Sequence, residues 1–246
     1  FFFLMMARMV TGIFGGVIGS IVLAISVDLF PLEMRGRVMG VIQTAFGASQ
    51  ILGIPAGLFF SNHWGWHAPF LMIVFCGLAV GVFIFIYLKP IYSHLKIKSE
   101  RNAIRHLYNT ATTPRYALAF LATVLLPMGG YMLMPFGSAF TVHNLGIAVE
   151  RLPLLYLITG LSAIVMGPLI GRASDRFGKF RIFTFGSIVS IIMVVIYTHL
   201  GVTPLVLVAL TNIILFVGIF SRMIPSQALV SAIPAMSDRG SFMALG

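Results

Sequence analysis

Charged side chains that could do chemistry are few in this sequence, and two groups stand out by position. Arg8 lies inside a long apolar run, and Asp175 and Arg176 stand next to each other between two other such runs. An Arg at the centre of a membrane helix costs about 2.5–3.5 kcal/mol, so a charge there is a functional candidate by default. A carboxylate such as Asp175 accepts hydrogen bonds and is favoured beside the positive N-terminal end of a helix.

The sequence contains no recognisable catalytic or metal-binding motif. The sequence holds no Gly-rich phosphate loop, no nucleophile triad and no pair of acids within an apolar run. His63 and His67 are four residues apart, but a Trp-Gly-Trp turn separates them, and a metal site would need further ligands. We therefore predict no cofactor and no metal. A membrane enzyme, which needs polar residues clustered at one depth, is the weaker alternative.

Composition limits the class of protein. The 246 residues are 59% hydrophobic and 9% charged, with a mean hydropathy of +1.03, whereas soluble domains carry about 45–50% apolar and about 25% charged residues. A soluble enzyme and a disordered chain are both excluded. The single cysteine, Cys76, excludes an internal disulfide framework. The net charge of +10 comes from short clusters between apolar runs and not from one solvated face that would bind nucleic acid.

The apolar runs have the lengths of membrane-spanning helices, each of which needs about 20 residues. The two longest runs carry no formal charge and are each long enough for two crossings. They break at sequences rich in Gly, Asn, His and Pro, which favour turns. The sequence thus predicts a bundle of seven crossings, located at 2–27, 38–88 (two), 116–141, 152–171 and 182–220 (two), with the first turns of an eighth after Arg239.

Basic residues set the predicted orientation. Most of the sixteen Lys and Arg residues fall in alternate connections, which the positive-inside rule places in the cytoplasm. Arg151 lies in an opposite connection, and the first crossing then runs from outside to inside. The inner clusters are Arg35 and Arg37; Lys89, Lys96, Lys98, Arg101, Arg105 and Arg115; Arg172, Arg176, Lys179 and Arg181; and Arg222 and Arg239.

An internal repeat links the two ends of the chain. Residues 30–40 and 233–244 share apolar-Pro, Arg-Gly and Met positions, and both lie on the predicted inner face. A parallel repeat of this kind is typical of transporters built from two six-helix halves. Chance similarity between two short polar loops is the alternative.

Several motifs resemble the major facilitator superfamily of transporters. Residues 171–181 are similar to the Gly-x-x-x-Asp-Arg-x-Gly loop between the eighth and ninth helices of that family. Residues 8–16 resemble its fourth-helix motif, an Arg followed by a Gly-rich face, and residues 49–57 resemble the fifth-helix Gly-Pro motif of its proton-coupled exporters. The stretch 45–70 looks like the arabinose-efflux-type permeases within the drug:proton antiporter families.

The resemblance covers the whole chain and implies a twelve-helix fold that is truncated here at both ends, from the fourth helix to the start of the eleventh. It implies part of the N-terminal bundle over 1–88, a cytoplasmic central linker over 89–114 and part of the C-terminal bundle over 115–246. For Arg8 it implies a role in proton coupling with an acidic partner on the first helix of the fold. Snorkelling of Arg8 to the outer interface is the alternative.

We interpret residues 171–181 as part of an inner gate. Asp175 is expected to accept hydrogen bonds near Arg35 or Arg37 and from the first amides of the helix that begins there, and opening the inner side would break these bonds. A solvated turn that only sets orientation is the alternative. The predicted gating residues are Gly171, Asp175, Arg176, Gly178, Lys179, Arg35, Arg37 and Arg239.

Other residues within the crossings are candidates for a cavity or a hinge. Gln43 and Gln50 are seven residues apart and share one helix face, where they would meet either a polar neutral ligand or a neighbouring helix. The predicted cavity residues are Gln43, Gln50, Tyr131, Asn144 and Asn212. The fifth-helix motif residues Gly47, Gly53, Pro55 and Gly57 would allow close packing or bending, and Gly12, Gly15, Gly16 and Gly19 would let helices approach. We expect a kink or an unwound turn where Pro127, Gly129, Gly130 and Pro135 occur.

Together these features predict a multi-pass transporter of a bacterial inner membrane that is not an enzyme. The predicted activity is proton-coupled efflux of a small molecule, a sugar or a drug-like compound, by alternating access. Its expected partners are the lipid bilayer, the substrate and protons, without nucleic acid, and it would work as a monomer. A receptor or non-transporting fragment and the membrane enzyme are the alternatives.

The orientation makes the first testable prediction. Cysteines that replace Lys98 and Arg151 in a Cys76→Ser background are expected to lie on opposite sides of the membrane, because one belongs to an inner and the other to an outer connection. An impermeant thiol reagent added to intact cells should label position 151 and spare position 98. Equal labelling of both positions from one side would contradict the predicted topology.

Overall fold

The computed structural model describes residues 2–87, 103–235 and 238–245. Within these ranges the chain is helical between short connections and has no strand, which confirms the predicted all-α fold. Among the described residues, six helical segments are long and apolar enough to cross a membrane: Phe2–Leu29, Ala68–Tyr87, Pro114–His143, Val149–Phe177, Lys179–His199 and Leu205–Val230. They correspond to six of the seven predicted crossings, and the crossing predicted from residue 38 is not among them.

The elements follow one another with few residues between them. In chain order they are α1 (Phe2–Leu29), α2 (Arg35–Ala48), α3 (Ile54–Trp64), α4 (Ala68–Tyr87), α5 (Ala103–Thr112), α6 (Pro114–Leu133), α7 (Gly137–His143), α8 (Leu152–Phe177), α9 (Lys179–His199), α10 (Leu205–Val230) and α11 (Arg239–Leu245). Short 3-10 turns at Leu32–Met34, Met134–Phe136 and Val149–Arg151 join some of them.

The crossing predicted from residue 38 onward consists of α2 and α3 joined by a π-helical segment, Ser49–Gly53. Pro55 lies at the start of α3. Because proline has no backbone N–H, it cannot donate to the carbonyl one turn earlier, and a widened π turn is a known way to accommodate the lost bond. The helix therefore changes regularity at the predicted fifth-helix motif.

The irregularity predicted near Pro127 to Pro135 is narrower than the sequence indicates. Pro127, Gly129 and Gly130 all lie within the regular helix α6. Only Met134–Phe136, which contains Pro135, adopts a 3-10 turn before α7 begins. The helix therefore breaks at the turn that contains Pro135, whereas α6 continues through Pro127 without a break.

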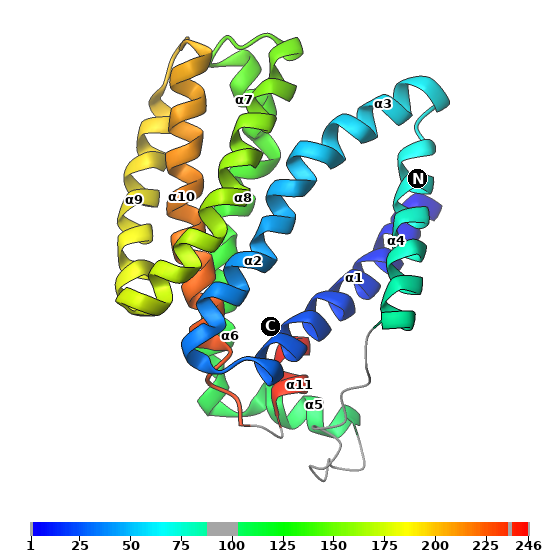
Figure 1. Ribbon diagram of the computed structural model, residues 1–246, viewed down its shortest axis with the longest axis vertical. Helices are drawn as coiled ribbons and strands as arrows, with labels where there is room; N and C mark the ends of the chain where they lie inside the picture. Colours follow the sequence, from blue (N-terminus) through cyan, green and yellow to red (C-terminus); the bar gives the residue numbers. More distant parts are fainter. Residues whose placement is uncertain (1, 88–102, 236–237, 246) are drawn as a thin grey trace.

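The helices form two groups that meet along α2 and α8 (Figure 1). Helices α8, α9 and α10 lie side by side, and α2 packs along α8 and touches α10. Buried Val27, Met39, Ala163, Phe220 and Ile224 form one apolar cluster between α1, α2, α8 and α10. No residue of α4 is buried among the described residues, so this helix presents its apolar side chains outward.

Glycines allow α2 and α8 to touch backbone to backbone. A Cβ atom added to Gly40 would lie 2.4 Å from the carbonyl oxygen of Gly167, and one added to Gly167 would lie 2.7 Å from that of Gly40. A Cβ atom added to Gly171 would lie 2.4 Å from the carbonyl oxygen of Gly36, and one added to Gly47 would lie 2.8 Å from that of Gly160. These distances are too short for any side chain, so the α2–α8 contact depends on small residues, as membrane helix packing commonly does.

The glycines predicted to pack α1 do not do so within the described residues. Nothing lies within 4 Å of a Cβ built on Gly12, Gly15, Gly16 or Gly19. Gly57 on α3 also faces open space, while Gly53 meets only its own helix at Ser49. Of the three glycines in the predicted fifth-helix motif, Gly47 is the one that makes a close interhelical contact among the described residues.

The helices extend beyond the predicted crossings at their inner ends. Helix α8 has 26 residues, or about 39 Å, which exceeds the ~30 Å hydrocarbon core. Arg172 and Arg176 therefore belong to α8, and Lys179 and Arg181 belong to α9, with only Gly178 between the two helices. Arg222 likewise lies inside α10 and not in an inner connection as the charge pattern predicted.

Part of the predicted linker is also helical. Residues 88–102 lie outside the described ranges, but α5 and Thr113 occupy the second half of the segment 89–114. The side chain of Thr110 on α5 is buried and hydrogen-bonds Ser241 on α11 at 3.0 Å. The connection between the two groups is therefore attached to the last helix of the chain.

The backbone contact predicts a strong cost for a single methyl group. Gly40→Ala and Gly167→Ala should each lower the free energy of unfolding by about 1–3 kcal/mol, because a backbone carbonyl cannot move aside as a side chain can. Gly77→Ala on α4, where nothing lies within 4 Å, is the matched control and should change little. Thermal unfolding in detergent measures the difference, and equal melting temperatures for all three variants would refute the contact.

Candidate functional site

The candidate site is centred on the carboxylate of Asp175, near the inner end of α8. Its Oδ1 accepts a hydrogen bond from the backbone N–H of Gly36 at 3.0 Å, and its Oδ2 accepts one from the N–H of Arg37 at 2.7 Å. Both amides belong to the first turn of α2. The sequence predicts bonds from Asp175 to the first amides of the helix that begins near Arg35 and Arg37, and both bonds are present in the structure. Their role in gating stays a prediction.

The first turn of α2 is built to receive a carboxylate. The opening N–H groups of a helix have no partner inside the helix, and the helix dipole adds partial positive charge there. The 3-10 turn Leu32–Met34 leads directly into α2, and no side chain caps the start of that turn at Pro31. Asp175 supplies the missing acceptor from a segment nearly 140 residues away, since its bonds join residues separated by 139 and 138 positions.

Glycine is required where the two segments meet. A Cβ atom on Gly36 would lie 2.5 Å from Asp175 Oδ1 and 2.8 Å from the carbonyl oxygen of Gly171. The predicted gating residue Gly171 therefore acts by leaving room for α2. Gly178, with φ of +99°, ends α8 in a conformation that side chains rarely adopt, and α9 begins at the next residue.

Lys179 is the third partner of Asp175. Its Nζ donates to Asp175 Oδ1 at 3.0 Å, and the two side chains are 12% and 15% exposed. Arg176 points elsewhere: it is exposed, and its guanidinium carbon lies 5.4 Å from the centre of the Phe177 ring. The side chain of Arg37 is exposed as well, so this residue contributes its amide to the Asp175 contact.

Of the two arginines that the sequence prediction named as alternatives near Asp175, Arg37 makes the contact through its amide and the side chain of Arg35 lies elsewhere. That side chain turns away from α8 and donates to the carbonyl oxygens of Val27, Phe30 and Ser231. The reason is local: the turn between α1 and α2 brings the exposed carbonyls at the end of α1 next to the start of α2. Arg239 begins α11, and its side chain lies outside the described residues.

A second polar junction, which sequence reasoning missed, joins α5, α6 and α11. Tyr116 Oη donates to Asp238 Oδ2 at 2.8 Å and accepts from the Ala235 N–H at 3.3 Å. His106 Nε2 lies 3.8 Å from Asp238 Oδ1, and Phe242 packs between the rings of Tyr116 and Phe120. The partial echo of 30–40 in 233–244 is the signal that could have drawn attention to this segment.

The remaining predicted residues do not come together. Arg8 is exposed on α1, two turns from its start. Gln43 and Asn212 are half-buried on α2 and α10, whereas Asn144 and Tyr131 are exposed. No side-chain hydrogen bond joins any two of these four within the described part of the chain, and the side chain of Gln50 lies outside that part. The substrate cavity therefore remains a prediction.

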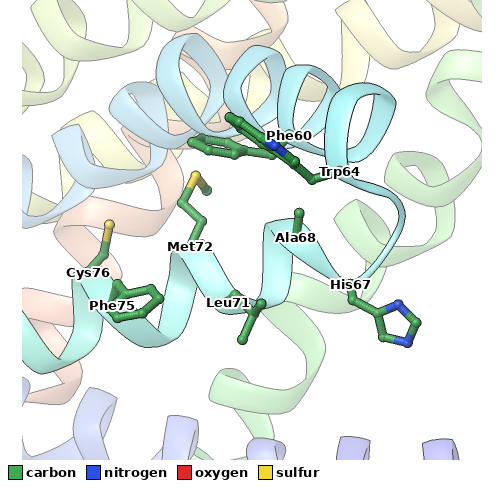
Figure 2. A pocket seen from close by; sticks show the side chains of 8 residues that line it. All are labelled: Phe60, Trp64, His67, Ala68, Leu71, Met72, Phe75 and Cys76. Carbon is green, nitrogen blue, oxygen red and sulfur yellow. The ribbon is translucent and has the colours of Figure 1, made fainter.

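An apolar groove of about 530 Å³ lies elsewhere, between α3 and α4. Figure 2 shows Phe60 and Trp64 of α3 above Met72 and Ala68 of α4. The two aromatic rings lie 5.2 Å apart with an interplanar angle of 30°. None of the predicted cavity residues lines this groove, whose walls are Phe60, Trp64, His67, Ala68, Leu71, Met72, Phe75 and Cys76.

Comparison with known proteins agrees with the helical architecture. The sequence profile of the Major Facilitator Superfamily matches residues 1–246. The uncharacterized MFS-type transporter YtbD of Bacillus subtilis is 26% identical over 174 residues, which cover 70% of this chain and 43% of YtbD. The multidrug resistance protein MdtG of Klebsiella pneumoniae is 22% identical over 196 residues, covering 78% and 47%.

A third relative is AraJ of Escherichia coli, which is 25% identical over 171 residues, covering 70% of this chain and 41% of AraJ. The chain thus spans less than half the length of the curated relatives it matches.

The Asp175 contact predicts a stability effect that depends on charge. Asp175→Asn should lower the free energy of unfolding by about 1.5–3 kcal/mol, the range for hydrogen bonds to a charged group, because the amide side chain keeps the shape but loses the charge. Glu150→Gln, which removes an exposed acid, is the control. Unfolding in detergent compares the two, and the contact has no energetic weight if they melt alike.

Proposed function

The chain belongs to the major facilitator superfamily, and on that premise we propose that it exports a small molecule across a bacterial inner membrane in exchange for protons. The observation that carries the proposal is the Asp175 carboxylate on the first amides of α2. It joins two segments that the predicted domain division assigns to different halves. Such a contact can hold one side of a two-lobed transporter closed and release it when the halves rock.

The surrounding geometry supports a closed inner side in this state. Along the inner half of α2, Gly36 and Gly40 touch Gly171 and Gly167 of α8. Opening requires these backbones to separate and the two amides of α2 to exchange Asp175 for water. Lys179 on α9 stays with Asp175 during such a movement because it belongs to the same helical pair. The charge of Asp175 is therefore never left without a partner.

Proton coupling is assigned to Arg8. The residue lies within α1, a helix with a mean hydropathy of 2.2 in its most apolar window. A guanidinium stays charged at all relevant pH values, so Arg8 does not carry the proton itself. Instead, it would lower the proton affinity of the acidic partner that the family resemblance implies on the first helix of the fold, and substrate binding would shift that balance.

The substrate is proposed to be uncharged or amphipathic. Only six acidic residues occur in the chain, and Asp175, Asp238 and Asp28 lie at inner helix ends. The polar side chains predicted for the cavity are amides and a phenol, which hydrogen-bond neutral groups. Two relatives are named for multidrug resistance, MdtG and the multidrug resistance protein 3 of Bacillus subtilis. A drug-like compound or a sugar fits this set, and the protein would act as a monomer.

Transport driven by a pH gradient tests the proposal. In proteoliposomes, an imposed gradient should drive accumulation of labelled substrate, and Arg8→Gln should abolish this drive while leaving exchange of labelled for unlabelled substrate, because exchange needs no net proton movement. Arg151→Gln, an exposed arginine of an outer connection, is the control. Substrate movement that ignores the gradient in the parent protein would overturn antiport, and binding without movement would point to a receptor.

A further inference from the structure

Arg35 is a buried charge that the proposed gate does not use. Its residue exposure is 5%, and it lies at the first position of α2. We propose that Arg35 is a positioning residue that fastens α10 to α1 and α2 at the inner end, by a contact separate from that of Asp175. The inference rests on the proposed function, because its purpose is to hold the inner side closed.

The guanidinium reaches three segments at once. Nη1 donates to the carbonyl oxygen of Ser231 at 3.1 Å and to its Oγ at 3.2 Å. Nη2 donates to Val27 O at 3.0 Å, and Nε donates to Phe30 O at 3.3 Å. Two bonds therefore stay within the α1–α2 region, and two reach a residue 196 positions later in the sequence.

Two of these acceptors, Val27 O and Ser231 O, lie at helix C-termini, where carbonyl groups lack partners and the dipole is negative. Ser231 follows directly on α10 as its C-terminal flanking residue, and Val27 lies in the last turn of α1. A cation is favoured at such ends. The arginine fork can serve two helix ends simultaneously because its donors point in fixed, divergent directions, whereas a lysine ammonium is a point charge on a flexible stem.

Burial makes the contact consequential. Ser231 is 2% exposed, and Val27, Met39 and Ile224 of the adjacent apolar cluster are at or below 2%. The inner ends of α2 and α10 lie side by side there (Figure 1). If α10 moves away, Arg35 loses its Ser231 acceptors in a region with little water, which is costly for a charged donor. This cost favours the arrangement in which α10 stays packed against α1 and α2.

The two inner contacts are complementary in sign. The N-terminus of α2 receives a carboxylate from α8, and the C-terminus of α10 receives a cation from α2. Each contact satisfies a helix end with a side chain from the other group of helices. Because they use different residues and different helices of the second group, their effects on closure should be independent and should multiply.

A buried reporter measures closure without any transport. Ile224→Cys in a Cys76→Ser background places a thiol in the apolar cluster between α1, α2, α8 and α10. In inside-out membrane vesicles, Arg35→Gln should raise the rate of labelling by a soluble thiol reagent about tenfold, within the usual range of conformational coupling. Arg35→Lys, which keeps the charge but not the fork, should give a smaller rise. Arg115→Gln, which changes an exposed arginine on α6 outside the gate segment, should leave the rate unchanged.

The outcomes separate this inference from the proposed gate. If Asp175→Asn raises labelling while Arg35→Gln and Arg35→Lys both match the parent, Arg35 only caps α1 and the inference is wrong. If the Arg35 variants raise labelling and Asp175→Asn does not, the Asp175 gate fails and the Arg35 contact stands. An Arg35→Gln and Asp175→Asn double variant whose rise is no larger than either single rise contradicts independence. Should the Gln variant fail to accumulate, the Lys variant decides alone, and a parental rate overturns the inference.

Discussion

Helix ends that are buried against another helix must still satisfy their backbone polar groups, and the inner face of this protein depends on that constraint. The first amides of α2 cannot reach water freely where α8 covers them, so a carboxylate from α8 takes the place of water. The contact in turn dictates small residues, because Asp175 can reach the amides only if Gly36 and Gly171 leave the two backbones close. At this site the electrostatic contact therefore depends on the close packing of the two helices.

The apolar pattern and the charges predict more of the secondary structure here than in a soluble protein, because a lipid bilayer permits fewer backbone conformations. An apolar run of crossing length must be helical, since no other single segment satisfies its backbone in a bilayer. The all-α fold and the positions of six of the seven predicted crossings followed from this rule. The ends did not, since α8 and α10 continue past the apolar limit into polar sequence that tolerates helix equally well, and Arg172 and Arg222 thereby became helical residues.

The candidate site could be predicted from the sequence where a charged side chain has one favourable type of partner. Asp175 is a lone acid near the start of a neighbouring helix, and a carboxylate beside free amides is favourable whatever the other details. Arg35 was not predictable, because its five donors can choose among many carbonyls and the choice depends on how α1, α2 and α10 meet. The Tyr116–Asp238 junction was missed for the same reason, since 122 residues separate its partners.

If the chain works by the proposed alternating access, the same contacts must be weak enough to open. A transporter alternates only if its two states differ by a few kcal/mol, because a larger difference would leave one state unpopulated. Bonds from two amides and a lysine to one carboxylate would oppose opening by more than that in an apolar interior. The side chains of Lys179 and Asp175 remain 12% and 15% exposed, so solvent partly reaches the contact. On opening, water replaces the protein partners, so only a net fraction of each bond opposes the movement. Charged contacts at partly exposed helix ends can therefore define one closed arrangement of the helices and still be broken when the helices separate.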